Sequence, residues 1–377
     1  MEELRNNITE RRWQTRSAIY HYLYNSSSPR SKLDISRDLN LSLPTVYQNV
    51  DELLAAGYIE YCGAQQSSGG RPAMQLRTVD DVCFAIGIYI TPHEIHLSTT
   101  NLSRTEIAYR RTANRGKFGT GEFNSFVAQE LESFIDGNAI PRERLKGVGL
   151  SIPGVVNADE TVLLYAPTLN VKNVDIRPLR QAIPYPTHVE NDATSGGFAE
   201  WYNSRERNGI AYLSITEGVG GTMLVNGALH AGNNNRSGEF GHMCVEWNGR
   251  PCACGKRGCL EAYCSALRFR DELGMNTEEF FYALSERNPK VTPLWEDYKK
   301  HLVQGVHNIR IALDCEVVLG GFVAEYLSPY LSELRGMLSE LNPFDTDGSF
   351  LRIDRQPRFD TIIGVAFYFI RDFIDGI

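Results

Sequence analysis

The 377-residue sequence lacks the long apolar run that a membrane-spanning helix requires, because no segment approaches about 18 uninterrupted apolar residues. Its opening stretch, MEELRNNITERRWQ, is charged and has no apolar core of the kind found in signal peptides. We therefore expect no membrane insertion and a cytoplasmic location, where the eight cysteines stay reduced.

The chain also lacks an excess of positive charge: 38 Lys and Arg against 46 Asp and Glu give a net charge of -8. A global basic field that would attract nucleic acid is thus excluded, so any DNA binding must come from one segment. Low-complexity tracts and short repeats are missing as well. With 42% hydrophobic and 22% charged residues the composition is that of a globular protein, and the length predicts two or three domains.

A cluster of cysteines stands out against this ordinary background. Cys252, Cys254 and Cys259 lie close together with glycines between them, and His242 precedes them. Thiolate and imidazole are the ligands that tetrahedral zinc prefers, and three thiolates with one imidazole fill all four positions. The pattern predicts one closed, structural zinc site per chain. The alternative is a set of unpaired or disulfide-bonded cysteines, although a Cys-x-Cys disulfide would be strained.

The first 77 residues predict three short helices followed by two strands. An apolar face over residues 12–24 indicates the first helix, and Ser31 and Ser42 are suited to cap the second and third. Strands are expected at 58–61 and 73–77, with a polar loop between them. This order is that of a winged helix-turn-helix domain, in which the third helix enters the major groove.

Several side chains of this segment are candidates for DNA contact. On the third helix, the side chains outside the predicted core can form hydrogen bonds to base edges or phosphates; they are Thr45, Tyr47, Gln48 and Asn49. In the loop, Arg71 can enter a narrow minor groove. Basic residues that offer phosphate contacts are Arg11, Arg12, Arg16, Arg30, Lys32 and Arg37. The alternative is a small helical interaction module, since acidic residues here are about as numerous as basic ones.

The rest of the chain alternates predicted strands and helices, which indicates α/β domains. A hairpin is expected over 82–98, and buried strands at 146–154, 188–192, 210–215 and 316–321. Residues 216–222 form a glycine-rich loop that can cradle phosphate.

Polar residues at strand ends predict a ligand cleft. Asn191 and Asp192 follow one strand and Gly154 follows another; Asp192 can serve as a general base, or the pair can simply cap a helix. Glu239 and Glu261 flank the cysteine cluster and can accept sugar hydroxyls, unless they are solvated surface glutamates.

Two stretches resemble the ROK family of repressors, open reading frames and kinases. Residues 42–57, SLPTVYQNVDELLAAG, and Gly69–Pro72 are similar to the DNA-binding domain of its regulators, where the arginine loop contributes to DNA contact, a role that Arg71 inherits. Gly238–His242, followed by Cys-x-Cys-Gly-x-x-Gly-Cys-x-Glu at 252–261, resembles the family's sugar- and zinc-binding segment, and Glu190–Ala193 matches a second motif.

The resemblance covers nearly the whole chain and implies its architecture. It implies a winged helix-turn-helix domain at 1–77 before a two-lobed, actin-like (RNase H-like) α/β sugar-kinase fold. The first lobe would span 78–200, with the helix in 359–377 packing back on it, and the second lobe 201–358 with the zinc knuckle.

Residue by residue, the resemblance also implies two sites. His242, Cys252, Cys254 and Cys259 would hold zinc. The sugar site would consist of Gly154, Asn191, Asp192, Glu239, His242 and Glu261, so that His242 belongs to both.

One departure decides between the family's two functions. Its kinases carry Asp-x-Gly-Gly-Thr in the first hairpin, where this chain reads Gly87-Ile-Tyr-Ile-Thr-Pro-His-Glu94. Bulky Tyr89 and Ile90 deny the close backbone approach that a phosphate needs.

The prediction is thus a non-enzymatic, sugar-responsive regulator, most simply a repressor of carbohydrate genes. Its partners would be a double-stranded DNA operator, a sugar or sugar phosphate, and a second copy in a homodimer or tetramer. The alternatives are a sugar kinase and a regulator switched by a sugar-transport protein.

Overall fold

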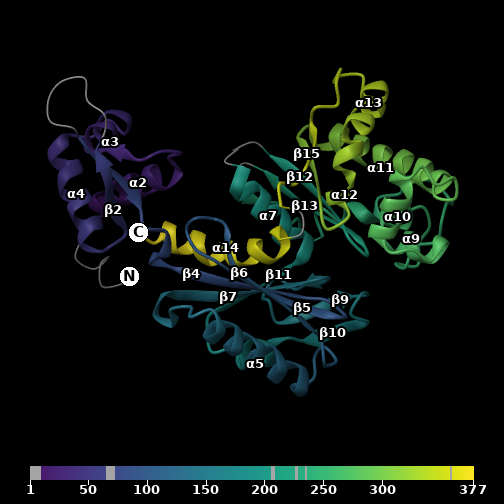
Figure 1. Cartoon of the computed structure of the whole chain (residues 1–377), viewed down its shortest axis with the longest axis horizontal. Coiled ribbons are helices and arrows are strands. Elements are labelled where there is room, and N and C mark those ends of the chain that lie inside the picture. Colours follow the sequence, from purple (N-terminus) through teal and green to yellow (C-terminus); the bar gives the residue numbers. More distant parts are fainter. Residues whose placement is uncertain (1–9, 65–72, 205–208, 226–227, 234–235, 357–358) are drawn as a thin grey trace.

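The computed structural model describes residues 10–64, 73–204, 209–225, 228–233, 236–356 and 359–377. Three parts can be followed in Figure 1: a small N-terminal head and two lobes, each built on its own five-stranded sheet. The predicted two-lobed α/β fold is confirmed. No helix within the described ranges combines the length and apolar character needed to cross a bilayer.

The head contains the predicted helices and strands. Its elements are α2 (Glu10–Asn25), α3 (Lys32–Asp38), α4 (Leu43–Ala55), β1 (Arg30–Ser31), β2 (Ile59–Ala64) and β3 (Met74–Thr78), with strand order β1-β3-β2. Ser31 caps α3 in a capping box and Ser42 caps α4, each accepting a backbone N–H. Gly57 ends α4 with φ 71°, a conformation that favours glycine. Most of the predicted wing loop, 65–72, lies outside the described residues.

The first lobe is a sheet with strand order β11-β7-β4-β5-β6. Its strands are β4 (Phe84–Ile90), β5 (Glu94–Thr100), β6 (Glu106–Ala113), β7 (Leu145–Ile152) and β11 (Thr187–Asn191). The lobe also contains the helices α5 (Gly121–Gly137) and α6 (Arg177–Ala182) and the short 3-10 helices η1 (Asp80–Val82) and η2 (Arg142–Arg144). A small separate sheet consists of β8 (Val155–Val156), β9 (Val162–Ala166) and β10 (Val171–Asp175). The β4–β5 hairpin is as predicted, whereas β6 and the small sheet are additional.

The second lobe has strand order β14-β13-β12-β15-β16. The strands are β12 (Ile210–Ile215), β13 (Val219–Val225), β14 (Ala228–Leu229), β15 (Glu316–Gly320) and β16 (Leu351–Ile353). The helices are η3 (Phe240–His242), α8 (Glu261–Cys264), α9 (Leu267–Leu273), α10 (Thr277–Ser285), α11 (Thr292–Leu313), α12 (Ala324–Leu327), η4 (Ser328–Tyr330) and α13 (Leu331–Leu341). The prediction of a glycine-rich loop over 216–222 is wrong in extent, because Val219–Thr222 pair with β12 as part of β13.

Two helices connect the three parts. α7 (Asp192–Ser204) follows β11, and α14 (Asp360–Asp375) crosses the first-lobe sheet toward the head (Figure 1). The crossing is close: a Cβ on Gly87 would lie 1.9 Å from the carbonyl oxygen of Ile362, and one on Gly149 would lie 2.5 Å from that of Val365. Glycine is therefore required at these strand positions for the helix to lie flat on the sheet.

The head docks on the C-terminal end of α14. Arg16 donates from Nε and Nη2 to the carbonyl oxygen of Ile377, at 3.2 and 3.1 Å. Tyr58 meets Phe373 edge-on with ring centres 5.7 Å apart. Arg16 is only 6% exposed, so its predicted phosphate contact is wrong: the side chain holds the head to the body instead.

Candidate effector, metal and DNA sites

All the residues predicted to bind sugar line one cavity between the lobes, with a volume of about 120 Å³. They come from strand ends and helix starts of both lobes, namely Gly154, Asn191, Asp192, Glu239, His242 and Glu261. Such placement follows the rule that ligands of α/β sheets bind beyond the carboxyl ends of strands.

Asn191 organises the first-lobe side of this cavity. Its Nδ2 donates to the carbonyl oxygen of Gly154 at 2.9 Å, and its Oδ1 accepts from the amides of Ala193 and Thr194 at 2.9 and 3.1 Å. Gly154 has φ 149°, and a Cβ there would lie 2.5 Å from the carbonyl oxygen of Tyr165. Asn191 thus caps α7 and also holds the turn after β7 in place.

Asp192 is a half-buried acid of the cavity. Burial raises its pKa to about 6, against the hydrogen bond that its Oδ1 accepts from the Ala193 amide at 3.0 Å. The hydroxyl of Tyr89 donates to its other oxygen at 3.4 Å. Tyr89, from the first hairpin of the lobe, therefore contacts the candidate base directly.

The two glutamates differ in their surroundings. Glu261 accepts the Val219 amide on Oε2 at 3.0 Å, and its Oε1 lies 3.5 Å from the Cys252 thiol. Glu239 opens to the cavity, where desolvation raises its pKa and the charge of Glu261 raises it further. Glu239 is the acceptor that a ligand hydroxyl reaches first, whereas Glu261 ties the cavity to the cysteine cluster.

The metal candidates converge as a group: ligand atoms of His242, Cys252, Cys254 and Cys259 all lie within 4.8 Å of one another. The sulfurs of Cys254 and Cys259 are 3.7 Å apart, and Cys252 Sγ lies 4.0 Å from His242 Nδ1. A tetrahedron with metal–sulfur bonds of about 2.3 Å has edges of about 3.8 Å, so the spacing fits a four-coordinate metal. All eight cysteines are free thiols, which removes the disulfide alternative.

His242 stands between the two sites. Its Nδ1 faces the thiol of Cys252, while the residue also lines the sugar cavity. A histidine whose ring is fixed by a metal on one side presents its other nitrogen in a defined direction. A metal held by this group would therefore link the order of the cysteine cluster to the shape of the cavity.

The DNA candidates of α4 divide into two groups. Tyr47 and Gln48 are exposed and Thr45 is half-buried, whereas Asn49 is 2% exposed and donates to the carbonyl oxygen of Thr45 at 2.8 Å. The prediction that Asn49 contacts DNA is wrong, because it lies on the buried stripe of α4. Arg71 lies outside the described residues.

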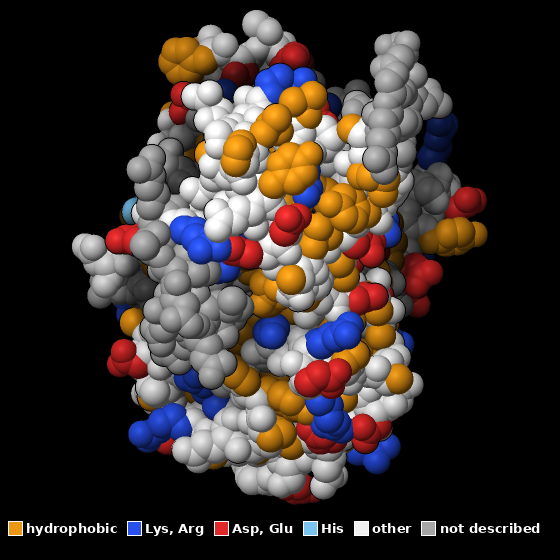
Figure 2. Space-filling model, turned by 90° about the vertical axis from the view of Figure 1, so that its left-hand side faces the viewer, with side chains coloured by type: hydrophobic (Ala, Val, Ile, Leu, Met, Phe, Trp, Pro, Cys, Tyr) orange, Lys and Arg blue, Asp and Glu red, His pale blue; other side chains and the backbone are white. Residues whose placement is uncertain are grey.

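The surface of the head is mixed in charge. Figure 2 shows Lys and Arg side chains among Asp and Glu and apolar ones on this side of the molecule. Lys32 pairs with Asp51 at 2.9 Å and lies 4.2 Å from the ring centre of Tyr47, and Arg12 pairs with Glu52. These basic residues of α2 and α3 are thus partly neutralised by acidic residues of α4.

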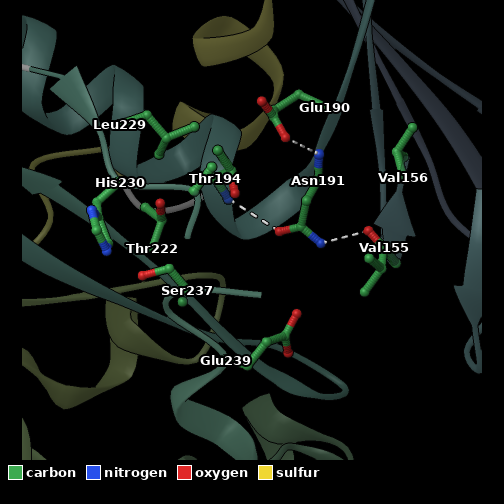
Figure 3. Close-up of a pocket in the computed structure, with 13 residues that line it drawn as sticks. Val155, Val156, Glu190, Asn191, Thr194, Thr222, Leu229, His230, Ser237 and Glu239 are labelled. Atoms are coloured by element: carbon green, nitrogen blue, oxygen red, sulfur yellow. Dashed lines mark hydrogen bonds between the residues drawn. The ribbon is translucent and has the colours of Figure 1, made fainter. Parts of the chain in front are cut away.

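Sequence reasoning missed a second group of polar residues beside the sugar cavity. They line an adjoining chamber of about 110 Å³ and include Thr194, Thr222, His230 and Ser237 (Figure 3). Thr194 could have been found, since it lies three residues after Asn191, in the first turn of α7. Ser237 and His230 carry no local motif that marks them.

The fold and the two adjoining sites define the class: a two-lobed, actin-like sugar-kinase scaffold preceded by a helix-turn-helix head. The ROK family profile matches residues 86–342, more than half of the chain. The chain therefore belongs to the ROK family.

Two relatives named as transcriptional regulators each match about two thirds of the chain. The chain is 28% identical to the xylose repressor of Bacillus subtilis over 68% of its length and 67% of that protein. It is 26% identical to the transcriptional dual regulator NagC of Escherichia coli K12 over 66% of its length and 62% of NagC.

Solved structures agree on the fold. A ROK regulator described as a homologue of E. coli Mlc superposes with a TM-score of 0.76 at 20% identity, covering 96% of this chain and 97% of that one. A ROK hexokinase of Thermus thermophilus superposes with a TM-score of 0.62 at 22% identity, covering 77% of this chain and 99% of the enzyme. The regulator thus matches nearly the whole chain, head included.

Proposed function

We infer that the protein is a sugar-responsive, DNA-binding transcriptional regulator that represses genes of carbohydrate uptake or metabolism. The observation that carries this proposal is the docking of a helix-turn-helix head on α14, which also packs on α7, the helix that starts in the sugar cavity. The names of the relatives, xylose repressor and NagC, agree with it.

The metal group is a structural zinc site in this proposal. Three thiolates and one imidazole at tetrahedral spacing suit zinc and leave no open position for substrate. When bound, zinc would fix the knuckle and the ring of His242 beside the cavity. One zinc per chain is expected.

A regulator rather than a kinase is supported by the first hairpin. Tyr89 occupies the place of a phosphate-loop residue and donates to Asp192, the candidate base. The alternative, an ATP-dependent sugar kinase, has support from the kinase relatives of the same fold. A coupled assay with ATP and a panel of hexoses decides between them: turnover at ordinary enzymatic rates would establish the kinase.

DNA binding is expected from a homodimer or tetramer whose recognition helices enter successive major grooves of an inverted repeat. Thr45, Tyr47 and Gln48 would lie toward the bases, and we retain Arg71 as a minor-groove contact. Genomic fragments retained by the purified, zinc-loaded chain at physiological salt test this. Enrichment of a common inverted repeat supports the regulator, and retention no different from background contradicts it.

The effector site is tested by Glu239→Ala. The variant should keep its zinc and its operator affinity but lose the response of operator binding to sugar, because the acceptor that opens to the cavity is gone. An abolished response with zinc and fold intact counts against switching by a protein partner such as a sugar-transport component, whereas a full response would show that Glu239 is not the acceptor.

A further inference from the structure

The cleft between the lobes continues beyond the predicted sugar cavity into a second chamber. The two chambers adjoin, because Gly154, Val155, Asn191 and Glu239 line both, and their volumes are about 120 and 110 Å³. Because the volumes are nearly equal, a ligand that fills the first chamber with one sugar ring has space for another ring of similar size in the second.

The walls of the second chamber combine hydroxyl groups with an apolar surface. Thr194, Thr222 and Ser237 supply hydroxyls, and none of these hydroxyls bonds to another residue within the described ranges. Val155 and Leu229 supply apolar surface (Figure 3). A sugar ring offers both counterparts, a C–H face and a rim of hydroxyls, so the chamber matches a second ring in chemistry as well as in volume.

The carboxylates of the lining oppose a phosphate in the same place, and the basic side chains among the lining residues are the imidazoles of His230 and His242. The described lining of both chambers contains Asp192, Glu190, Glu239 and Glu261 but neither lysine nor arginine. A phosphate group carries a charge of about -1.5 to -2 at neutral pH and needs cationic or amide donors.

Three further donors near the chambers are poorly placed for a phosphate. The amides of Ala193 and Thr194, at the start of α7, already donate to the side chain of Asn191. Arg236 is exposed and lies outside the lining; its charge only partly offsets the burial that raises the pKa of Glu239.

We propose that the effector is an uncharged saccharide of two rings, one in each chamber, rather than a monosaccharide or a sugar phosphate. The proposal rests on the proposed function, since it assumes that the cavity lined by Glu239 and His242 holds the first ring. The second ring would lie between Val155 on one side and Thr222 and Ser237 on the other (Figure 3).

Isothermal titration of the full, zinc-loaded chain tests the proposal with xylose, glucose, glucose 6-phosphate, xylobiose, cellobiose and maltose as probes. At least one disaccharide should bind tenfold or more tightly than its own monosaccharide, and glucose 6-phosphate should not bind. Disaccharides that bind no better than their monosaccharides, or preferential binding of glucose 6-phosphate, would overturn the inference and leave the regulator intact. If no probe binds and none shifts operator affinity, the result contradicts both the two-ring effector and the proposed sugar-responsive function.

A pair of threonine variants separates the two chambers. Thr194→Val removes a hydroxyl from the second chamber, and Thr168→Val removes one that lines only the first. Thr194→Val should weaken the disaccharide about fivefold, the effect of one lost hydrogen bond, and leave the monosaccharide unchanged. Thr168→Val should weaken both ligands alike. Equal losses for both ligands in Thr194→Val would contradict the two-ring arrangement, with thermal unfolding confirming that each variant is folded.

Discussion

At the scale of single residues, the cysteine cluster offers a matched pair of substitutions. Cys254 belongs to the four-residue group, whereas Cys244 lies next to Cys259 in an isolated bridge but is exposed and outside the group. Cys254→Ser should lower bound zinc from about one per chain to near zero, because a hydroxyl is a far poorer ligand than a thiolate. Metal analysis after gel filtration measures this.

Cys244→Ser is the control and should retain about one zinc per chain. About one zinc per chain in both variants would show that the metal site has been assigned to the wrong residues. Loss of zinc in both would point to Cys244 as a ligand.

A buried carboxyl pair predicts a specific pH dependence of stability. Asp354 and Asp360 are 4% and 1% exposed, and their carboxylates lie within 4.8 Å of each other and of Glu200. Burial and the neighbouring charges raise the pKa of Asp354 to about 7 and that of Asp360 well above its ordinary value. Stability from this pair is fully present below pH 4 and is lost as pH rises through about 7, because the folded state holds the proton more tightly.

Asp360→Asn should remove this dependence, since an amide mimics the protonated acid. We expect the variant to unfold at the same denaturant concentration as the parent at pH 5. At pH 8.5 it should be more stable by about 1–3 kcal/mol. Asp372→Asn, exposed on the same helix, is the control and should follow the parent at both pH values. Parallel curves for Asp360→Asn and the parent would contradict a shared proton.

How far single residues could be read from the sequence depended on their spacing. The grouping of the candidate sugar and metal residues could be predicted because their types are distinctive and their motifs are contiguous. Asn49 was misassigned although the spacing was available: Val46, Asn49, Val50 and Leu53 form one helical stripe, and all are buried. The prediction gave more weight to the polarity of Asn49 than to its position. In the structure its position on the helix buries it, and its Nδ2 donates to the carbonyl oxygen of Thr45.

At the scale of elements, α14 depends on the absence of side chains beneath it. Gly149→Ala would place a Cβ 2.5 Å from the carbonyl oxygen of Val365, and backbone cannot move aside as a side chain can. We expect a loss of about 1–3 kcal/mol in the free energy of unfolding, as for other overpacked sites. Chemical denaturation measures it.

Gly336→Ala provides the opposite expectation with the same chemistry. Gly336 lies within α13, and a Cβ there meets nothing within 4 Å. The variant should gain up to about 1 kcal/mol from improved helix propensity. If both alanines changed stability in the same direction, close packing of α14 on the sheet would not be the cause.

Helices and strands could be predicted where a hydrophobic period or a helix-capping residue marks them. They were missed where the strand forms only through pairing with a neighbouring strand. The caps at Ser31 and Ser42 located α3 and α4 to within a residue or two. β6 was missed although its exposure alternates along its length, because its residues are largely polar and its strand state comes from pairing with β5. The sheet of β8, β9 and β10 is likewise built from short strands with little apolar pattern.

At the scale of the whole molecule, α7 is the physical connection between the effector cavity and the head. It begins at Asp192 in the cavity, and Tyr202 near its other end contacts α2 of the head. The hydroxyls of Tyr202 and Tyr24 are 3.0 Å apart, and Arg104 donates to the Tyr24 hydroxyl at 2.7 Å and to the carbonyl oxygen of Tyr202 at 3.2 Å. A movement of α7 on ligand binding therefore acts directly on the head.

This contact predicts a loss of coupling without a loss of either binding site. In Tyr202→Phe combined with Arg104→Ala, the ratio of operator affinities without and with effector should fall by about fivefold or more, since each lost hydrogen bond contributes about 1 kcal/mol to the coupling. Effector affinity in the absence of DNA should change much less, because neither residue lines the cavity. Fluorescence anisotropy on the operator, repeated over a range of effector concentrations, measures both quantities.

Tyr22→Phe is the matched control, because its hydroxyl donates to Asp38 within the head at 2.6 Å and touches neither lobe. It should retain the full response. Communication through α7 requires that the double variant lose coupling while Tyr22→Phe keeps it. An unchanged ratio in the double variant would mean that the effector reaches the head by another route, of which α14, held to the head by Arg16 and Ile377, is the alternative.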